Sequence, residues 1–454
     1  MSSPSQSPGD GAPIEFNCPT CGARLRVAHE LAGRAVRCSK CTTQLKVPTA
    51  SNVNPTAPVS QTAANPTASS SSAPSPPARS PAAQPADSLF AEDGAETFSP
   101  PTRTSPMSSA PPATSEPTGR RSIKEMLSAS GKYETRDTPT RRLFDRVVEQ
   151  VSKIYVGQDE LVLGTLVALF SSGHVLIESV PGLGKTLFVR TLGRVLGCDF
   201  GRIQFTADLM PSDITGAPIF NVKEQEFLFR PGPVFTQVLL ADEINRAPAK
   251  THAALLEIMQ EYRVTVDGTS HRLTRPFLVI ATQNPVESEG TYNLPEAQLD
   301  RFMFKLIADY PTEAEEAQIL EMHSRQIDVG KRIEEELEQV TTPEEILRAT
   351  QENASVRVDP KLVEYINRLV RATREWPQFY LGASPRAGLA LMQGARTLAA
   401  FCGRDYAIPD DVVQIALPVL RHRVVLTAEA EVEQLTVDGI LGEMMRTIEV
   451  PRLS

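Results

Sequence analysis

A glycine-rich turn between an apolar run and a helical pattern holds the residues best suited to binding a polyphosphate. Residues 175–177 are apolar and typical of a buried strand, and a helical pattern begins at Lys185. Glycines in such a turn let backbone N–H groups approach phosphates, and the positive end of the new helix faces the same charge. Lys185 can reach the β- and γ-phosphates, while the Thr186 hydroxyl can ligate Mg²⁺. The residues expected to bind nucleotide here are Pro181, Gly182, Leu183, Gly184, Lys185, Thr186 and Leu187.

Ser179 stands where the nucleotide-loop pattern has its first glycine. Glycine eases the turn out of the strand, so we expect serine to strain the backbone or to change nucleotide affinity slightly. The alternative interpretation of the stretch is an ordinary corner between a strand and a helix. The run Gly-Leu-Gly-Lys-Thr at 182–186 favours the nucleotide site over that alternative.

Two further apolar runs end in polar residues that could complete a phosphate-transfer site. Residues 238–240 lead to Asp242 and Glu243, and residues 277–281 lead to Asn284. Asp242 is expected to hold the water shell of Mg²⁺, Glu243 to polarise the attacking water, and Asn284 to orient it at the γ-phosphate. The alternatives are a solvated acidic loop and, for an asparagine before proline, a simple turn. The order of the strands predicts an α/β fold with a doubly wound parallel sheet and its functional groups at the carboxyl edge.

Four cysteines near the start of the chain have the spacing of a structural zinc site. Cys18-x-x-Cys21 and Cys38-x-x-Cys41 are separated by sixteen residues. Four thiolates would close the coordination shell and staple a segment too short to fold alone. Disulfides are the alternative, disfavoured because the chain opens without a signal-peptide pattern. The segment has few aromatic residues, which favours protein docking or a spacer role over nucleic-acid binding.

Bulk properties limit the class of protein further. The 454 residues exceed what one hydrophobic core holds, so several domains are expected. A net charge of -9 and a pI near 5.4 argue against a broad nucleic-acid-binding surface. No uninterrupted apolar run is long enough for a membrane span, and a reducing cytoplasm is the expected location.

Composition and periodicity divide the chain into four expected segments. These are a zinc-ribbon-like domain at 14–48, a disordered Pro/Ser/Ala/Thr-rich linker at 49–137, an α/β nucleotide-binding core at 138–310 and an all-α lid domain at 311–454. Two β-hairpins are expected as insertions in the core, at 219–229 and 263–273, the second turning at Asp267-Gly268. They are either surface decoration or, as their place between the catalytic strands favours, contacts for partners or substrate. The expected lid helices are 313–325, 343–352, 360–374, 384–401 and 409–420.

Residues 138–454 resemble the MoxR family of AAA+ ATPases. The resemblance rests on stretches at 202–216 (Arg-Ile-Gln-Phe-Thr-Ala-Asp-Leu-Met-Pro-Ser-Asp-Ile-Thr-Gly), 241–247 (Ala-Asp-Glu-Ile-Asn-Arg-Ala), 281–285 (Ala-Thr-Gln-Asn-Pro), 289–292 (Glu-Gly-Thr-Tyr), 294–302 (Leu-Pro-Glu-Ala-Gln-Leu-Asp-Arg-Phe), 382–387 (Gly-Ala-Ser-Pro-Arg-Ala) and 403–406 (Gly-Arg-Asp-Tyr). The chain departs from the family at Ser179, at Ala207 where proline is usual, and at Tyr262 where arginine is common. Only Ser179 touches the chemistry.

The resemblance implies a homo-oligomer, a hexameric ring with each ATP between two subunits. Arg301 then becomes the arginine finger that reaches the neighbour's γ-phosphate, and Arg386 the second sensor, contributed by the lid of the same subunit. The alternatives are a surface salt bridge for Arg301 and a helix-start residue for Arg386. The implied function is Mg·ATP hydrolysis that remodels, assembles or activates a client protein, such as a von Willebrand A-domain protein.

Two other classes of function remain open. A zinc ribbon beside a ring ATPase also fits a nucleic-acid-associated motor, although the acidic balance counts against it. A nucleotide-gated scaffold with little turnover is the other, motivated by Ser179 in the nucleotide loop.

Overall fold

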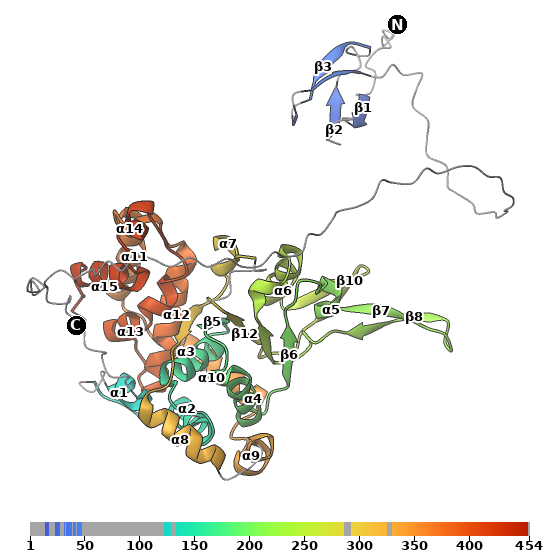
Figure 1. Cartoon of the computed structure of the whole chain (residues 1–454). Helices are drawn as coiled ribbons and strands as arrows, with labels where there is room; N and C mark the ends of the chain where they lie inside the picture. The colour runs from blue at the N-terminus through green and yellow to red at the C-terminus, as the bar shows by residue number, and fades with distance from the viewer. Residues whose placement is uncertain are drawn as a thin grey trace, which may run out of the picture. The chain divides into compact units, whose positions relative to one another are not determined.

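The computed structural model describes residues 14–17, 23–27, 31, 33–38, 40, 41, 43–47, 122–128, 133–285, 292–324 and 329–452 (Figure 1). The chain separates into two compact units, Met1–Ser108 and Ser109–Ser454. No helix in these described ranges is long and apolar enough to cross a bilayer.

The first unit contains two small antiparallel strand pairs. Strand β1 (Ile14–Asn17) pairs with β2 (Arg24–Val27), and β3 (Ala35–Arg37) pairs with β4 (Gln44–Lys46). Cys38, which follows β3, is buried and packs with Leu45 and Cys41. Cys18 and Cys21 lie outside the described residues, as do residues 49–121 of the predicted linker. The zinc site and the disorder of the linker therefore stay predictions.

A five-stranded parallel sheet forms the centre of the second unit, in the order β13-β5-β12-β9-β6. Its strands are β5 (Val175–Ser179), β6 (Phe200–Gln204), β9 (Val238–Asp242), β12 (Leu278–Gln283) and β13 (Phe304–Ala308). Successive side chains of a strand point to opposite faces, and both faces are covered here. Val238 and Leu240 belong to one hydrophobic cluster, while Leu239 and Ala241 belong to the other. Such double burial explains why these strands read as continuous apolar runs.

Helices cover the two faces of this sheet. Helices α2 (Pro139–Ser152), α3 (Asp159–Phe170) and α4 (Lys185–Leu196) contribute to the first cluster, and α6 (Ala249–Glu261) contributes to the second. The six-residue helix α1 (Ile123–Ser128) lies inside the stretch assigned to the linker and buries Ile123 and Met126 in the first cluster. The α/β prediction is confirmed for this core.

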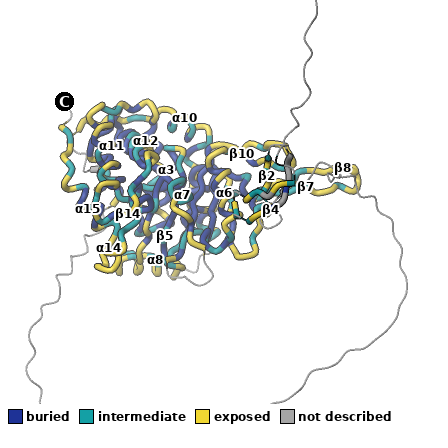
Figure 2. Tube along the Cα trace, turned by 90° about the horizontal axis from the view of Figure 1, so that it is seen from above, coloured by how far each residue is buried: buried dark blue, intermediate teal, exposed yellow. Residues whose placement is uncertain are grey.

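Two antiparallel strand pairs lie outside the central sheet, each as a separate two-stranded sheet. Strand β7 (Gly216–Asn221), which follows α5 (Pro211–Thr215), pairs with β8 (Glu226–Pro231), and β10 (Arg263–Val266) pairs with β11 (Thr269–Arg272). Asp267 and Gly268 both have positive φ, 47° and 76°, as a tight hairpin turn requires. Figure 2 shows β8 as exposed, in contrast to the buried central sheet.

The C-terminal part is mainly helical. Its helices are α8 (Glu313–Ser324), α9 (Val329–Glu336), α10 (Pro343–Ala354), α11 (Pro360–Glu375), α12 (Pro385–Phe401), α13 (Pro409–Leu420), α14 (Ala428–Val432) and α15 (Val437–Thr447). Thr342, Asp359 and Ser384 cap α10, α11 and α12 with side-chain oxygens, each directly before a proline at the first helical position. The expectation of an all-α lid is wrong in one detail, because β14 (Phe379–Leu381) pairs with β15 (Val425–Leu426).

Candidate active site

The sheet register places the ends of three adjacent strands at one edge. Strand β12 lies between β5 and β9, with Gln283 opposite Glu178 and Ala281 opposite Ala241. Asn284 therefore follows β12 at the level where β5 ends in Ser179, next to the end of β9 at Asp242. The turn that leads to Lys185, the two acids and Asn284 come from separate parts of the chain and meet at this carboxyl edge.

The turn after β5 needs glycine at both predicted positions. Gly182 and Gly184 have φ of 90° and 72°, in the left-handed region that side chains rarely adopt. A Cβ at Gly182 would meet no atom within 4 Å, so the space beside the turn is open. Gly184 forms the N-terminal cap of α4, and Lys185 is the first residue of that helix. The turn thus combines an open backbone with a helix N-terminus, the arrangement that binds phosphates.

Tyr155 borders this turn, although no local pattern in the sequence indicates a role for it. A Cβ at Gly184 would lie 3.6 Å from its ring carbon Cε2, and the ring packs on Phe188 of α4 with centroids 4.9 Å apart. Burial raises the pKa of the Tyr155 hydroxyl, which keeps it protonated. The signal in the sequence was weak, because only the folded chain brings Tyr155 from the end of α2 to α4.

Lys185 is held by the residue that departs from the loop pattern. Its Nζ donates to Ser179 Oγ at 2.9 Å and to the Val180 carbonyl at 3.4 Å. Ser179 is buried, and its φ is not positive, so the strain predicted there is not observed. The serine acts on the side chain of Lys185 rather than on the backbone of the turn.

Asp242 is a buried carboxylate fixed by two donors. Thr282 Oγ1 donates to Oδ1 at 2.7 Å, and Arg202 donates to Oδ2 at 2.7 Å. Both donors come from strands that flank β9 in the sheet. Thr282 and Arg202 were missed in the sequence, because their proximity to Asp242 depends on strand order rather than on any local motif.

Glu243 adopts a left-handed backbone conformation, which costs energy for residues other than glycine. Its φ is 56°, and its N–H donates to Thr282 Oγ1 at 2.8 Å. Its carboxylate Oε2 accepts from Gln204 Nε2 at 2.8 Å and lies 3.1 Å from Arg246 Nε. Strained backbone held by surrounding contacts is common at functional sites. Contacts with Gln204, Arg246 and Thr282 thus fix the position of Glu243 next to Asp242.

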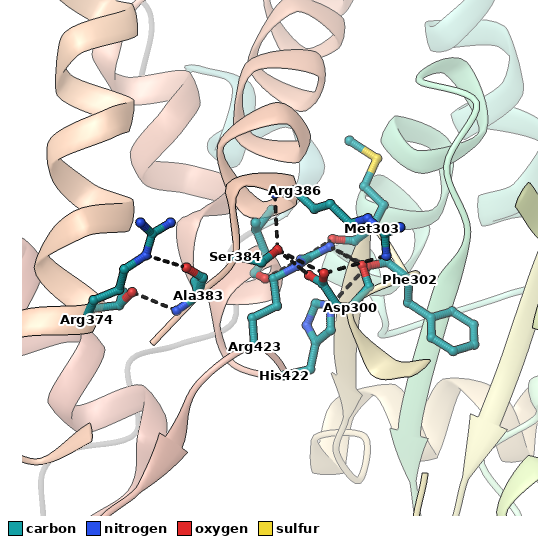
Figure 3. Close-up of polar contacts among 11 residues, drawn as sticks. Asp300, Phe302, Met303, Arg374, Ala383, Ser384, Arg386, His422 and Arg423 are labelled. Carbon is teal, nitrogen blue, oxygen red and sulfur yellow. Dashed lines mark hydrogen bonds and ion pairs between the residues drawn. The ribbon is translucent and has the colours of Figure 1, made fainter. Parts of the chain in front are cut away.

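The two predicted arginines lie near the amino edge of the sheet, because residues 300 and 301 precede β13, whose first residue Phe304 pairs with Val175 at the start of β5. The glycine turn follows β5 at the opposite edge, so Arg386 does not reach the turn of its own subunit, as the second-sensor prediction requires. Arg301 follows the short helix α7 (Glu296–Leu299) and donates to the Leu256 carbonyl of α6 at 2.7 Å, so it contacts α6. Arg386, on the first turn of α12, lies with Nη1 3.7 Å from Asp300 Oδ2, beside Ser384 (Figure 3).

Cys38 and Cys41, the described half of the cysteine set, each make a hydrogen bond through sulfur. The Lys40 backbone N–H donates to Cys38 Sγ at 3.4 Å, and the Cys41 thiol donates to Thr43 Oγ1 at 3.3 Å. Within the described ranges no group of three or more His, Cys, Asp or Glu residues is arranged to hold a metal. Because two of the four cysteines lie outside those ranges, the set itself stays untested.

Comparisons with known proteins agree with this geometry. The family model described as "ATPase family associated with various cellular activities (AAA)" matches residues 174–304, and the one described as "AAA lid domain" matches residues 371–443. The chain is 47% identical over 309 residues to the uncharacterized protein YeaC of Bacillus subtilis. The aligned region covers 68% of this chain and 95% of YeaC. The chain is also 44% identical over 321 residues to chaperone MoxR1 of Mycobacterium tuberculosis, and that alignment covers 68% of this chain and 83% of MoxR1. A crystal structure of a proposed ATPase from Cytophaga hutchinsonii matches with a TM-score of 0.64 and 39% identity, covering 69% of this chain and 96% of that one.

Proposed function

Because the chain belongs to the MoxR family of AAA+ ATPases, we propose that it hydrolyses Mg·ATP and uses the cycle to remodel a client protein. One observation carries the proposal: the register of β5, β12 and β9 brings the glycine turn, Asn284 and the Asp242–Glu243 pair to one edge of the sheet. Phosphoryl transfer needs little covalent chemistry from a protein, and positioning with charge stabilisation supplies most of the catalysis.

Nucleotide binding falls to the turn and to the start of α4. The backbone of residues 181–187 and the Lys185 ammonium hold the phosphates, and the open space beside Gly182 admits them. The oxygens of Thr186 and Asp242 suit Mg²⁺, which prefers hard oxygen ligands and keeps several waters. The metal, when bound, neutralises charge that develops between the β- and γ-phosphates.

Water activation falls to Glu243 and Asn284. Gln204 and Arg246 fix the Glu243 carboxylate. This carboxylate orients the attacking water and acts as the general base that accepts its proton. Asn284 hydrogen-bonds the γ-phosphate and holds the water in line. Arg386 lies beside Asp300 at the opposite edge of the sheet, so we assign it no contact with the γ-phosphate of its own subunit.

The remaining roles require a second subunit and a client. Arg301 completes the neighbour's site in a ring, which we take to be a hexamer. The exposed pair β7–β8 carries Phe220 and Phe227, whose rings lie 5.2 Å apart, and it offers an apolar surface to a client. A von Willebrand A-domain protein is one candidate client, and relatives named MoxR and MoxR1, the latter a chaperone, make a protein client the favoured class.

The first unit is proposed to bind one structural zinc through Cys18, Cys21, Cys38 and Cys41. Metal analysis of the purified chain should find one zinc ion per chain. Replacing Cys38 with serine should abolish zinc binding. Zinc content unchanged by that replacement would contradict the assignment.

The test of the chemistry is steady-state ATP turnover. Glu243→Gln keeps the shape of the side chain and removes its base, so turnover should fall by about 10²-fold or more while ATP still binds. Glu261→Gln is a matched control, because Glu261, the last residue of α6, is an exposed acid paired with Arg263 of β10. Equal turnover in wild type and Glu243→Gln would overturn the catalytic role.

A further inference from the structure

The strand pair β10–β11 carries two arginines directly opposite each other. Arg263 of β10 pairs in register with Arg272 of β11. Alternate side chains of a strand share a face, so both arginines lie on the face that also carries Thr265 and Ser270. Like charges directly opposite each other destabilise a strand pair, so this arrangement costs stability. Such a departure from a local rule is expected at a functional site.

A hollow of about 800 Å³ borders this face of the strand pair. Arg263 and Arg272 line it together with Arg275, which follows β11. Glu261, at the end of α6, also lines the hollow and lies 3.0 Å from Arg263, so these two charges offset each other. Arg272 and Arg275 remain as local positive charge in a chain whose net charge is -9. The hollow therefore attracts anions.

The charges of Arg272 and Arg275 are not used inside the subunit. Both side chains are exposed, and in the part of the chain that the structure describes no carboxylate pairs with either. Arg275 instead lies over the ring of Tyr262, with its Cζ 3.9 Å from the ring centroid. A stacked guanidinium keeps its N–H donors at its rim, where a carboxylate can accept two hydrogen bonds.

The size of the hollow and the spread of its charges favour an acidic peptide as the ligand. A volume of about 800 Å³ lies in the range of sites for molecules much larger than a single inorganic ion. A nucleic acid is disfavoured because the chain is acidic and because the ring of Tyr262, beneath Arg275, is not free to stack on a base. Carboxylates spaced along a peptide can instead meet Arg272 and Arg275 separately.

We propose that the hollow beside β10–β11 binds an acidic segment of the client protein through Arg272 and Arg275. The strand pairs β10–β11 and β7–β8 contact each other, because His271 of β11 stacks on Phe229 of β8 with ring centroids 3.9 Å apart (Figure 1). A client that lays apolar residues on β7–β8 can thus reach the hollow with a neighbouring acidic stretch. This inference rests on the proposed function, because it takes the partner to be that client.

Fluorescence anisotropy of the full chain with a labelled peptide of alternating glutamate and alanine tests the inference. Wild type should bind this peptide, more weakly as salt is added, and should not bind the counterpart with lysine in place of glutamate. Arg272→Gln should weaken binding by about 3- to 5-fold, since an exposed ion pair contributes up to about a factor of five. Arg272→Lys should retain most of the affinity, because the charge remains.

Two controls separate a lost ion pair from a damaged fold. Arg371→Gln removes the same charge from an exposed position of α11 in the lid, and it should leave the affinity for the peptide unchanged. Arg272→Gln removes the repulsion between Arg272 and Arg263, so urea unfolding should show no loss of stability.

Three results would overturn the inference. They are no binding of the acidic peptide by wild type, equal affinity in wild type and Arg272→Gln, and tighter binding of single-stranded oligothymidylate than of the peptide. The last result would assign the hollow to nucleic acid. ATP turnover is measured on the same wild-type preparation. Turnover without peptide binding would overturn only this inference, whereas peptide binding without turnover would contradict the proposed function.

Discussion

Ser179 supplies Lys185 with a hydrogen-bond acceptor inside its own loop. Because the backbone there is unstrained, a substitution should act through the missing hydroxyl. Ser179→Ala and Ser179→Gly should both change the Kd of ATP by the same few-fold factor. The glycine variant should also lose about 0.5–1 kcal/mol of unfolding free energy, because glycine is more flexible in the unfolded chain. Nucleotide titration and urea unfolding of both variants provide the measurements.

An affinity change in Ser179→Gly that is absent in Ser179→Ala would show that backbone freedom, not the hydroxyl, controls the loop. Such a result would restore the interpretation drawn from the sequence pattern alone.

Single residues were predictable where a local pattern carries the chemistry. Gly182, Gly184 and Lys185 form such a pattern, and the two glycines adopt the positive φ that the pattern implies. Thr282 and Asp300 were not predictable, because their partners Asp242 and Arg423 lie far along the chain. The order of strands in the sheet brings the first pair together, and the packing of the lid on the core brings the second together. Neither arrangement produces a recognisable spacing in the sequence.

At the scale of elements, helix α1 joins the start of the second unit to the core. Met126 is 5% exposed, and the backbone N–H of Ile123 donates to Asp159 Oδ2 of α3 at 2.9 Å. Met126→Ala should lower the free energy of unfolding by about 2–5 kcal/mol, the usual cost of truncating a buried methionine. Lys124→Ala, at an exposed position of the same helix, should change it by less than about 0.5 kcal/mol.

Urea unfolding of the full chain, followed by circular dichroism, checks this prediction. If Met126→Ala and Lys124→Ala unfold at the same urea concentration as wild type, α1 contributes nothing to the core.

Elements with strong periodicity or double burial were predictable, and short ones were not. The apolar runs of β5, β9 and β12 follow from burial on both faces of the sheet. Helices α11 and α12 follow from a capping residue before proline. Helix α1 and the pair β14–β15 are too short to carry a period, so only tertiary packing defines them.

At the scale of the whole molecule, the proposed ring makes each site depend on Arg301 of a neighbour. Arg301→Ala should retain ATP binding and lose turnover by about 10³-fold or more, because an arginine finger contributes that much to phosphoryl transfer. Arg263→Ala is the control, since Arg263 lines the same surface pocket and is paired with Glu261.

Mixing two inactive variants distinguishes a neighbour's arginine from one acting within its own chain. Arg301→Ala protomers keep Glu243, and Glu243→Gln protomers keep Arg301, so mixed assemblies should recover turnover. No recovery in assemblies shown to contain both variants would place the action of Arg301 within its own subunit.

The central claim is that Lys185, Thr186, Asp242 and Asn284 surround one triphosphate at the carboxyl edge of the sheet. A crystal structure of Glu243→Gln with Mg·ATP tests it most directly. We predict one ATP per chain, with its phosphates on the backbone of residues 181–187 and its magnesium ion coordinated by Thr186 near Asp242. An ATP bound elsewhere, or phosphates distant from both Lys185 and Asp242, would contradict the account.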